Sequence, residues 1–112
     1  MNKIQDEMQA LVGDGAEDML AELAPMFLED ATFLMGELAT AVTTATSTRI
    51  RETAHTLKGS SASLGIRRFS RLCYEMELMG RENDLLHAAE KLAQIQAEYA
   101  AVITALGNYL SP

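Results

Sequence analysis

His55 is the residue best placed to do chemistry, within the run AHTLKGS at residues 54–60. A neutral imidazole offers a nucleophilic nitrogen at cellular pH, so a histidine can accept a group covalently. Lys58 and Gly59 follow at spacings of three and four, which bring both beside the imidazole on a helix. A lysine there would attract an anionic reactant such as a phosphoryl group, and a glycine would let a partner approach closely. The pattern predicts a covalent acceptor site.

Helix geometry predicts which way this site faces, because successive residues turn by about 100°. The apolar side of the helix is centred on Ile50 and includes residues within about 40° of it. These residues are Ala54, Leu57, Ser61 and Leu64. His55 lies roughly 140° from that centre, Gly59 roughly 180° and Lys58 about 80°. We therefore expect the imidazole to face solvent with Lys58 on its flank, which suits a nucleophile served by another protein.

Helical apolar periodicity runs through almost the whole chain, with no repeat and no competing strand pattern. The expected helices cover residues 2–12, 16–42, 47–64, 66–80 and 85–109. Their apolar residues recur at spacings of three, four and seven, so each helix has one face to bury. We predict an all-α protein with a single domain at residues 1–112. Its fold would be an antiparallel up-down-up-down four-helix bundle with a short additional N-terminal helix.

Several residues mark where these helices begin, bend or end. Pro25 lacks a backbone donor inside the second helix, so we expect a kink or a restart there. The expected caps and stops are Thr46 or Ser47 before the third helix, Gly65 after it, and Asn83 or Asp84 before the fifth. The connections between helices are therefore predicted to be short.

Composition and charge exclude several classes of function. The net charge of −7 argues against a nucleic-acid partner, whose phosphates require a basic surface. No stretch reaches the roughly 18 apolar residues needed to cross a bilayer, and residues 1–7 lack the pattern of a signal peptide. The single cysteine, Cys73, excludes an internal disulfide and fits a reducing compartment. We expect a cytoplasmic protein without membrane contact.

Basic residues gather around His55. Residues 49–71 hold six of the nine Lys and Arg residues and only one acid, Glu52, so this stretch is +5 and the remainder −12. A basic surface on an acidic body steers in an acidic or phosphorylated partner. The predicted docking residues are Arg51, Glu52, Ala62, Arg67, Arg68 and Arg71.

The chain resembles the histidine-containing phosphotransfer (HPt) domain family. The family signature is His-x-Leu-Lys-Gly, then small residues and Leu-Gly, and it appears as HTLKGSSASLG at residues 55–65. The likeness continues in LCYEME at residues 72–77 and MFLEDA at residues 26–31, so it covers nearly the whole chain. Pro25 departs from the family pattern, which keeps that stretch helical.

The resemblance implies a phosphorelay intermediate. His55 would accept a phosphoryl group from the phospho-aspartate of a response-regulator receiver domain and pass it to another receiver. Lys58 would offset the charge of the phosphoryl group, and Gly59 would permit close approach. We expect no cofactor in this chain, and we expect magnesium to be bound by the partner receiver. No phosphate-binding loop of the nucleotide type is present in the sequence, so we expect a covalent carrier and not an enzyme. A hybrid sensor histidine kinase is a further expected partner, and the family favours a monomer.

Two other functions compete with this interpretation. A helical scaffold or adaptor would bind partners with His55 incidental. A di-metal carboxylate bundle is suggested by Glu52-x-x-His55 and weakly echoed by Asp84-x-x-His87. Glu52 lies about 200° from the apolar centre, however, so it is not expected to reach a metal in the core. His87 has no lysine or glycine at the matching spacings and is interpreted as a surface residue. A free-standing protein and the terminal module of a hybrid kinase are both compatible with these residues.

Overall fold

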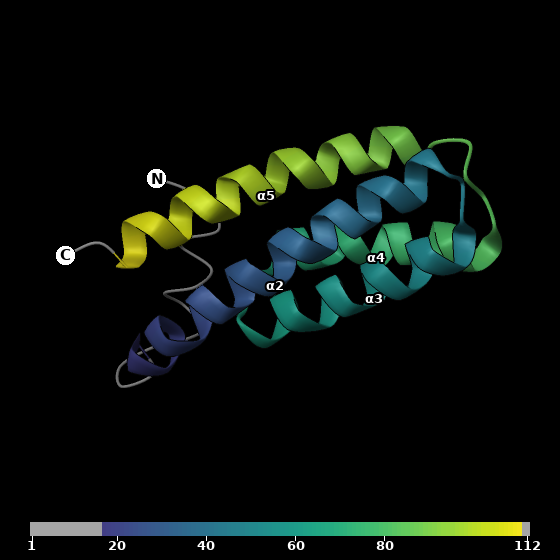
Figure 1. The fold of residues 1–112 in the computed structure, drawn as a ribbon. Coiled ribbons are helices and arrows are strands. Elements are labelled where there is room, and N and C mark those ends of the chain that lie inside the picture. Colours follow the sequence, from purple (N-terminus) through teal and green to yellow (C-terminus); the bar gives the residue numbers. More distant parts are fainter. Residues whose placement is uncertain (1–16, 111–112) are drawn as a thin grey trace.

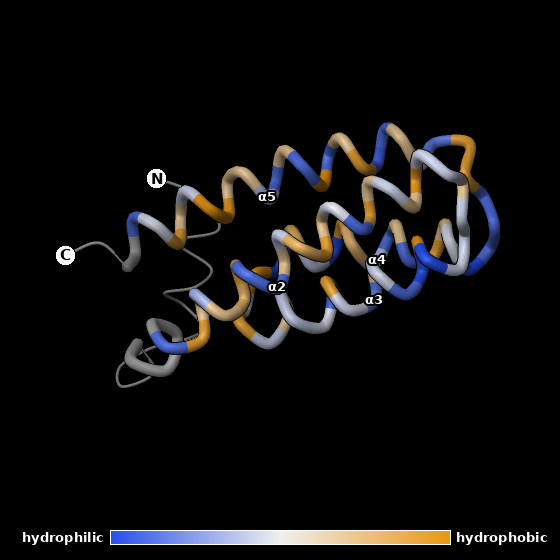
Figure 2. The backbone as a smooth tube through the Cα atoms, viewed as in Figure 1, coloured by the Kyte–Doolittle hydropathy of each residue, from blue (hydrophilic) through white to orange (hydrophobic). Residues whose placement is uncertain are grey.

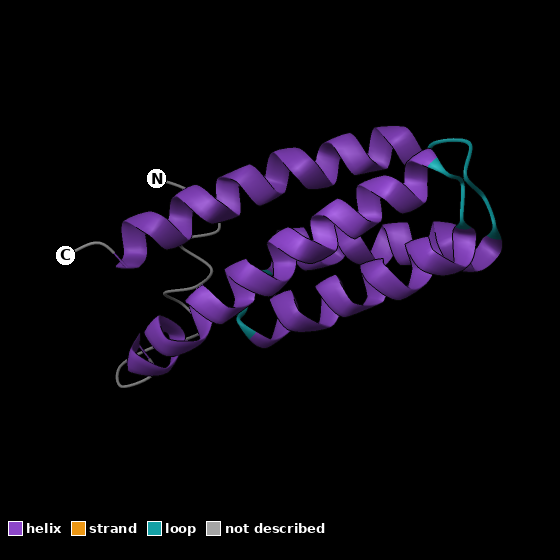
Figure 3. Cartoon of the chain, viewed as in Figure 1, coloured by secondary structure: helices purple, strands orange, loops and turns teal. Residues whose placement is uncertain are grey.

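The computed structural model describes residues 17–110, and four helices make up nearly all of that range (Figures 1 and 3). They are α2 (Glu17–Thr43), α3 (Ser47–Ser63), α4 (Arg67–Glu82) and α5 (Ala88–Leu110). Consecutive helices run in opposite directions and pack side by side, and α5 returns to α2 to close the bundle. No strand occurs among the described residues. The all-α four-helix bundle is thus confirmed, whereas the expected helix at residues 2–12 lies outside the described part.

Helix α2 passes through Pro25 without interruption. A proline leaves the carbonyl four residues earlier without its helical donor. The Pro25 ring lies on the exposed side of the helix, whereas its neighbours Ala24 and Phe27 are buried. Water can satisfy the freed carbonyl on that side, while packing on the other side keeps the helix together. Of the two expected effects of Pro25, a kink or a restart of the helix, the restart is therefore wrong.

The turn between α3 and α4 is tight and follows the expected glycine stop. Gly65 has φ 77°, in the left-handed region that favours glycine. The Gly65 N–H donates to Ala62 O at 3.0 Å, and the Ile66 N–H donates to Ser61 O at 2.9 Å. These bonds satisfy carbonyls at the end of α3. The chain consequently reverses at once, so α3 and α4 lie side by side.

The connections that precede α3 and α5 differ from the caps expected there. Thr46 occupies the position before α3, but its hydroxyl pairs with the Thr44 hydroxyl at 2.9 Å and makes no cap bond to the helix. Asn83 ends α4 with φ 53° and does not begin the last helix, and Asp84 donates its N–H back to Met79 O at 2.9 Å. Helix α5 starts only at Ala88. Both residues therefore serve the end of α4 because a left-handed residue stops a helix there.

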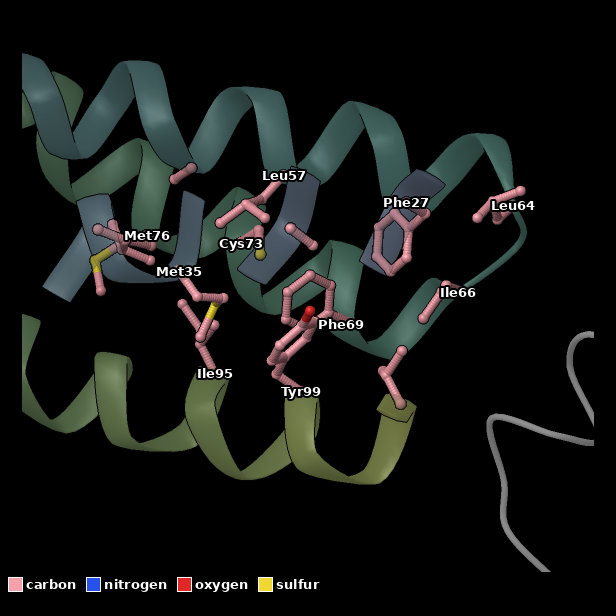
Figure 4. Close-up of a cluster of buried hydrophobic side chains, with 14 of the residues drawn as sticks. Phe27, Met35, Leu57, Leu64, Ile66, Phe69, Cys73, Met76, Ile95 and Tyr99 are labelled. Carbon is pink, nitrogen blue, oxygen red and sulfur yellow. The ribbon is translucent and has the colours of Figure 1, made fainter. Parts of the chain in front are cut away.

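The core lies along the axis of the bundle, where all four helices turn their apolar faces (Figure 2). Its largest fully buried side chains include Phe69, Leu38, Ile50, Leu57, Ile66, Met76 and Ile95. Figure 4 shows Phe69 beside Tyr99, with ring centres 5.6 Å apart, and Cys73 among the apolar side chains. The face expected for the third helix is buried, including Ser61.

Helices α3 and α4 approach each other closely at Gly80. A Cβ atom there would lie 2.7 Å from the backbone N of Arg51 and 2.8 Å from Ser47 O. Real Cβ atoms do not come so near to backbone atoms, so only glycine allows this approach. The contact fixes the start of α3 against the end of α4. The two helices that carry the candidate site are thereby held together next to it.

Candidate functional site

His55 lies in the middle of α3 and points to solvent, as the helix geometry predicts. Its side chain is 64% exposed. One ring nitrogen, Nδ1, lies 3.1 Å from Oε2 of Glu77 on α4. A carboxylate can only accept a hydrogen bond, so Nδ1 carries the proton that it donates. This leaves the lone pair on Nε2, which is the nucleophilic nitrogen of the neutral ring.

Glu77 is the central residue of the site, although no sequence pattern predicted a role for it. Only 3% of its side chain is exposed, yet it faces three cationic or potentially cationic groups. Oε1 lies 2.8 Å from Lys58 Nζ, and Oε2 lies 2.9 Å from Arg81 Nη2 as well as near His55. The available signal was its position, because Glu77 falls on the same stripe of α4 as buried Phe69 and Cys73.

The surroundings of Glu77 keep it ionised. Burial by itself raises the pKa of a carboxyl group because the charged form loses hydration. Hydrogen bonds from Lys58 and His55, and the attraction of their charges, outweigh burial and hold the pKa of Glu77 below its usual value of 4.5. At neutral pH the carboxylate therefore presents a negative charge to the imidazole. It can stabilise positive charge that develops on the ring.

Lys58 reaches across the groove between α3 and α4. Its side chain is 28% exposed, and Nζ lies 5.2 Å from the centre of the Tyr74 ring in addition to contacting Glu77. The backbone carbonyl of Lys58 accepts a hydrogen bond from the Ser70 hydroxyl at 3.0 Å. A cation is thus held on the flank of His55, where the helix geometry places it.

Gly59 lies at an exposed position of α3, one turn after His55. A Cβ atom built there would meet nothing within 4 Å. The fold therefore does not require glycine, although glycine lowers the stability of a helix interior. This contrasts with Gly80, where the packing of the two helices excludes any side chain.

The structure separates the predicted docking residues into three places. Arg51 and Glu52 line a cleft with His55, Thr56, Glu77 and Arg81. Ala62, Arg67 and Arg71 line a second cleft, together with Lys58, Ser70 and Tyr74. Arg68 points elsewhere, because its Nε lies 3.3 Å from Glu98 on α5. Both clefts follow the groove between α3 and α4, so Arg68 does not belong to the surface around His55.

The residues suggested for a di-metal site do not converge. The Glu52 side chain is 56% exposed and its nearest ionic neighbour is Arg49, at 4.0 Å. His87, which is 61% exposed, lies just before α5 and 3.5 Å from Glu90. Within the described residues no three His, Cys, Asp or Glu side chains are grouped to hold a metal. A di-metal bundle needs ligands that project into its core, and Glu52 and His55 do not.

Comparisons with known proteins agree with this geometry. Residues 22–105 match the family model described as "Hpt domain". The chain is 30% identical over 103 residues to histidine-containing phosphotransfer protein 2 of Arabidopsis thaliana, an alignment that covers 89% of this chain and 66% of that protein. The crystal structure of histidine-containing phosphotransfer protein B from Pseudomonas aeruginosa has the same fold, with a TM-score of 0.76 at 24% identity, covering 97% of this chain and 92% of the other. The chain belongs to the Hpt domain family, a family of histidine phosphotransfer proteins. Within the described residues no helix is long and apolar enough to span a membrane.

Proposed function

We propose that this protein is a phosphorelay intermediate in which Nε2 of His55 accepts a phosphoryl group from a receiver domain's phospho-aspartate and passes it to a second receiver. One observation carries the proposal: an exposed imidazole is held through Nδ1 by a buried, ionised carboxylate. That arrangement orients the ring and directs the lone pair of Nε2 to a partner. The match to the Hpt domain family supports the same chemistry.

The groups of the site and of the donor account for every bond, electron pair and proton in the transfer. The Nε2 lone pair attacks phosphorus, the N–P bond forms, and the P–O bond to the donor aspartate breaks with its electrons remaining on the aspartate carboxylate. No proton needs to move, since Nδ1 keeps its hydrogen. The phosphorylated ring then carries a positive charge, which the Glu77 carboxylate stabilises at 3.1 Å. The reverse attack by a second aspartate restores neutral His55.

Lys58 and the arginines of the α3–α4 groove give the phosphoryl group and its carrier an electrostatic partner. We assign Lys58 to charge compensation and Gly59 to close approach of the receiver. Arg51, Ala62, Arg67 and Arg71 line the surface that meets the acidic receiver site, with Glu52 at its edge. Arg68 is left out of this surface because it pairs with Glu98. Arg71→Ala is therefore expected to raise the receiver concentration for half-maximal transfer, and Arg68→Ala serves as its control.

The remaining parts of the proposal concern context. Receiver domains are the proposed partners, with magnesium bound on their side, and a hybrid sensor kinase is a proposed source of phosphate. The protein acts as a covalent carrier without turnover of its own. A monomer in the cytoplasm is part of the proposal, and the free, buried thiol of Cys73 fits a reducing compartment.

The decisive experiment is transfer from a labelled phospho-receiver to the wild-type protein. We expect label that is acid-labile and base-stable, that is lost in His55→Gln, and that persists in His87→Gln. His87 is a matched control because its side chain is 61% exposed, against 64% for His55. Label that survives in His55→Gln contradicts the assignment. If the wild type takes up no label and His55→Ala still binds the receiver normally, the protein is instead a scaffold.

A further inference from the structure

Lys58 has two neighbours on α4, and they are of different kinds. Its Nζ lies 2.8 Å from Glu77 Oε1 and 5.2 Å from the centre of the Tyr74 ring. Tyr74 precedes Glu77 by three residues, so both side chains project from adjacent turns of one helix face. The lysine is consequently 28% exposed, although a lysine at the flank of a helix can extend freely into water. Its ammonium is held by a carboxylate and by an aromatic ring.

These two neighbours affect the charge of Lys58 differently. A carboxylate compensates the charge of an ammonium, and Glu77 already serves His55 and Arg81 through its other oxygen. An aromatic ring attracts a cation through its quadrupole and has no net charge. The ring therefore restricts the position of the ammonium and leaves its charge available to a phosphoryl group. This matters for lysine because its long side chain has many conformations to lose.

The surroundings of Tyr74 indicate that it acts through the face of its ring. The side chain is 44% exposed and stands outside the core. Its hydroxyl makes no hydrogen bond to any residue between 17 and 110. Tyr74 also lines the cleft that holds Lys58, Arg67 and Arg71, so an ammonium on its ring stays on the surface that the partner meets. Core packing and hydrogen bonding thus do not explain an aromatic residue here.

We propose that Tyr74 is a positioning residue for phosphoryl transfer, which holds the Lys58 ammonium beside His55 without cancelling its charge. The inference rests on the proposed function of His55. Without the ring, Lys58 has only the carboxylate of Glu77 to hold it in the groove, and it divides its time between that carboxylate and open solvent. An incoming phosphoryl group then meets a weaker positive field.

The test compares Tyr74→Leu with Tyr74→Phe in single-turnover transfer from a labelled phospho-receiver at saturating concentration. Tyr74→Leu is expected to slow transfer by about two- to five-fold, the change that a partly exposed cation–π contact supports. Tyr74→Phe keeps the ring face and is expected to rescue the rate. In a Lys58→Ala background, Tyr74→Leu should cause no further loss, because the contact on which it acts is already gone. Thermal unfolding of each variant verifies that the bundle is intact.

A spectroscopic measurement follows the contact directly. A ring beside the ammonium shifts the NMR signals of the Lys58 ε-methylene protons, and this shift should persist in Tyr74→Phe and vanish in Tyr74→Leu. Equal rates for Tyr74→Leu and wild type overturn the inference while leaving His55 as the acceptor. So does a full Tyr74→Leu effect in the Lys58→Ala background, which would mean that Tyr74 acts by docking. Absence of label on wild-type His55 overturns both proposals.

Discussion

Replacing Glu77 with glutamine tests the buried carboxylate most sharply, because the side chain keeps its size and loses its charge. The carboxylate accepts a hydrogen bond from His55 Nδ1 at 3.1 Å, and the ring becomes positive as phosphate is transferred. A hydrogen bond to a charged group contributes about 1.5–3 kcal/mol and a neutral one about 0.5–1.5 kcal/mol. The loss of about 1–1.5 kcal/mol in the transition state corresponds to transfer that is about 5- to 13-fold slower.

The assay is single-turnover transfer from a labelled receiver, with Glu75→Gln as the matched control. Glu75 is also on α4, but its side chain is 42% exposed and pairs with Lys91 at 2.6 Å. It does not contact His55, so its variant should transfer at the wild-type rate. An unchanged rate in Glu77→Gln, or equal losses in the two variants, would refute the role given to the buried charge.

The same variant predicts a pH dependence of stability. The folded protein lowers the pKa of Glu77, through Lys58 and His55, so the ionised carboxylate stabilises the fold at pH values above 4.5. As the pH falls below 4.5 and through the lower pKa of the folded state, this contribution is lost. The difference in Tm between wild type and Glu77→Gln should therefore be present above pH 4.5 and shrink as the pH falls below that value. A difference that grows in acid contradicts the assignment.

Three other substitutions or treatments follow from the packing. Gly59→Ala should stabilise the bundle by about 0.5–1 kcal/mol, because the added Cβ meets nothing within 4 Å, and thermal unfolding measures this effect. The same substitution should slow transfer because the methyl group obstructs the receiver, and the transfer rate measures that effect. Gly80→Ala should instead destabilise by about 1–3 kcal/mol, because its Cβ meets backbone at 2.7 Å, and a Tm equal to that of wild type would contradict the close helix contact. Burial raises the pKa of Cys73 to about 12, so its thiol should resist alkylation at pH 8 in the native protein and react after unfolding, which mass spectrometry detects.

Much of the fold was predictable because it depends on periodicity. The buried face of α3 and the stop at Gly65 follow from spacing and from the conformational freedom of glycine, and both are present. Asn83 was misassigned because asparagine serves both as a helix start and as a left-handed helix end. Choosing between these roles requires knowing where the next helix begins, and that is decided by packing against the core.

The site was predictable only in part, for a related physical reason. His55, Lys58 and Gly59 lie within five consecutive residues, so helix geometry alone relates them. Glu77 and Tyr74 reach them from another helix, and the rotation of α4 about its axis decides whether they do. Arg68 shows the converse, since it belongs to the basic stretch of the sequence but faces Glu98. Charge counted along a chain does not locate a surface.

The close contact at Gly80 has a consequence for quality control in the relay. His55 and Glu77 come from separate helices, and the close contact at Gly80 contributes to holding those helices together. A chain in which α3 and α4 have separated still contains the histidine but lacks the carboxylate that orients its ring. Damaged molecules should therefore accept phosphate poorly and withdraw little of it from the signal. Only the correctly packed bundle therefore has the complete site for carrying phosphate.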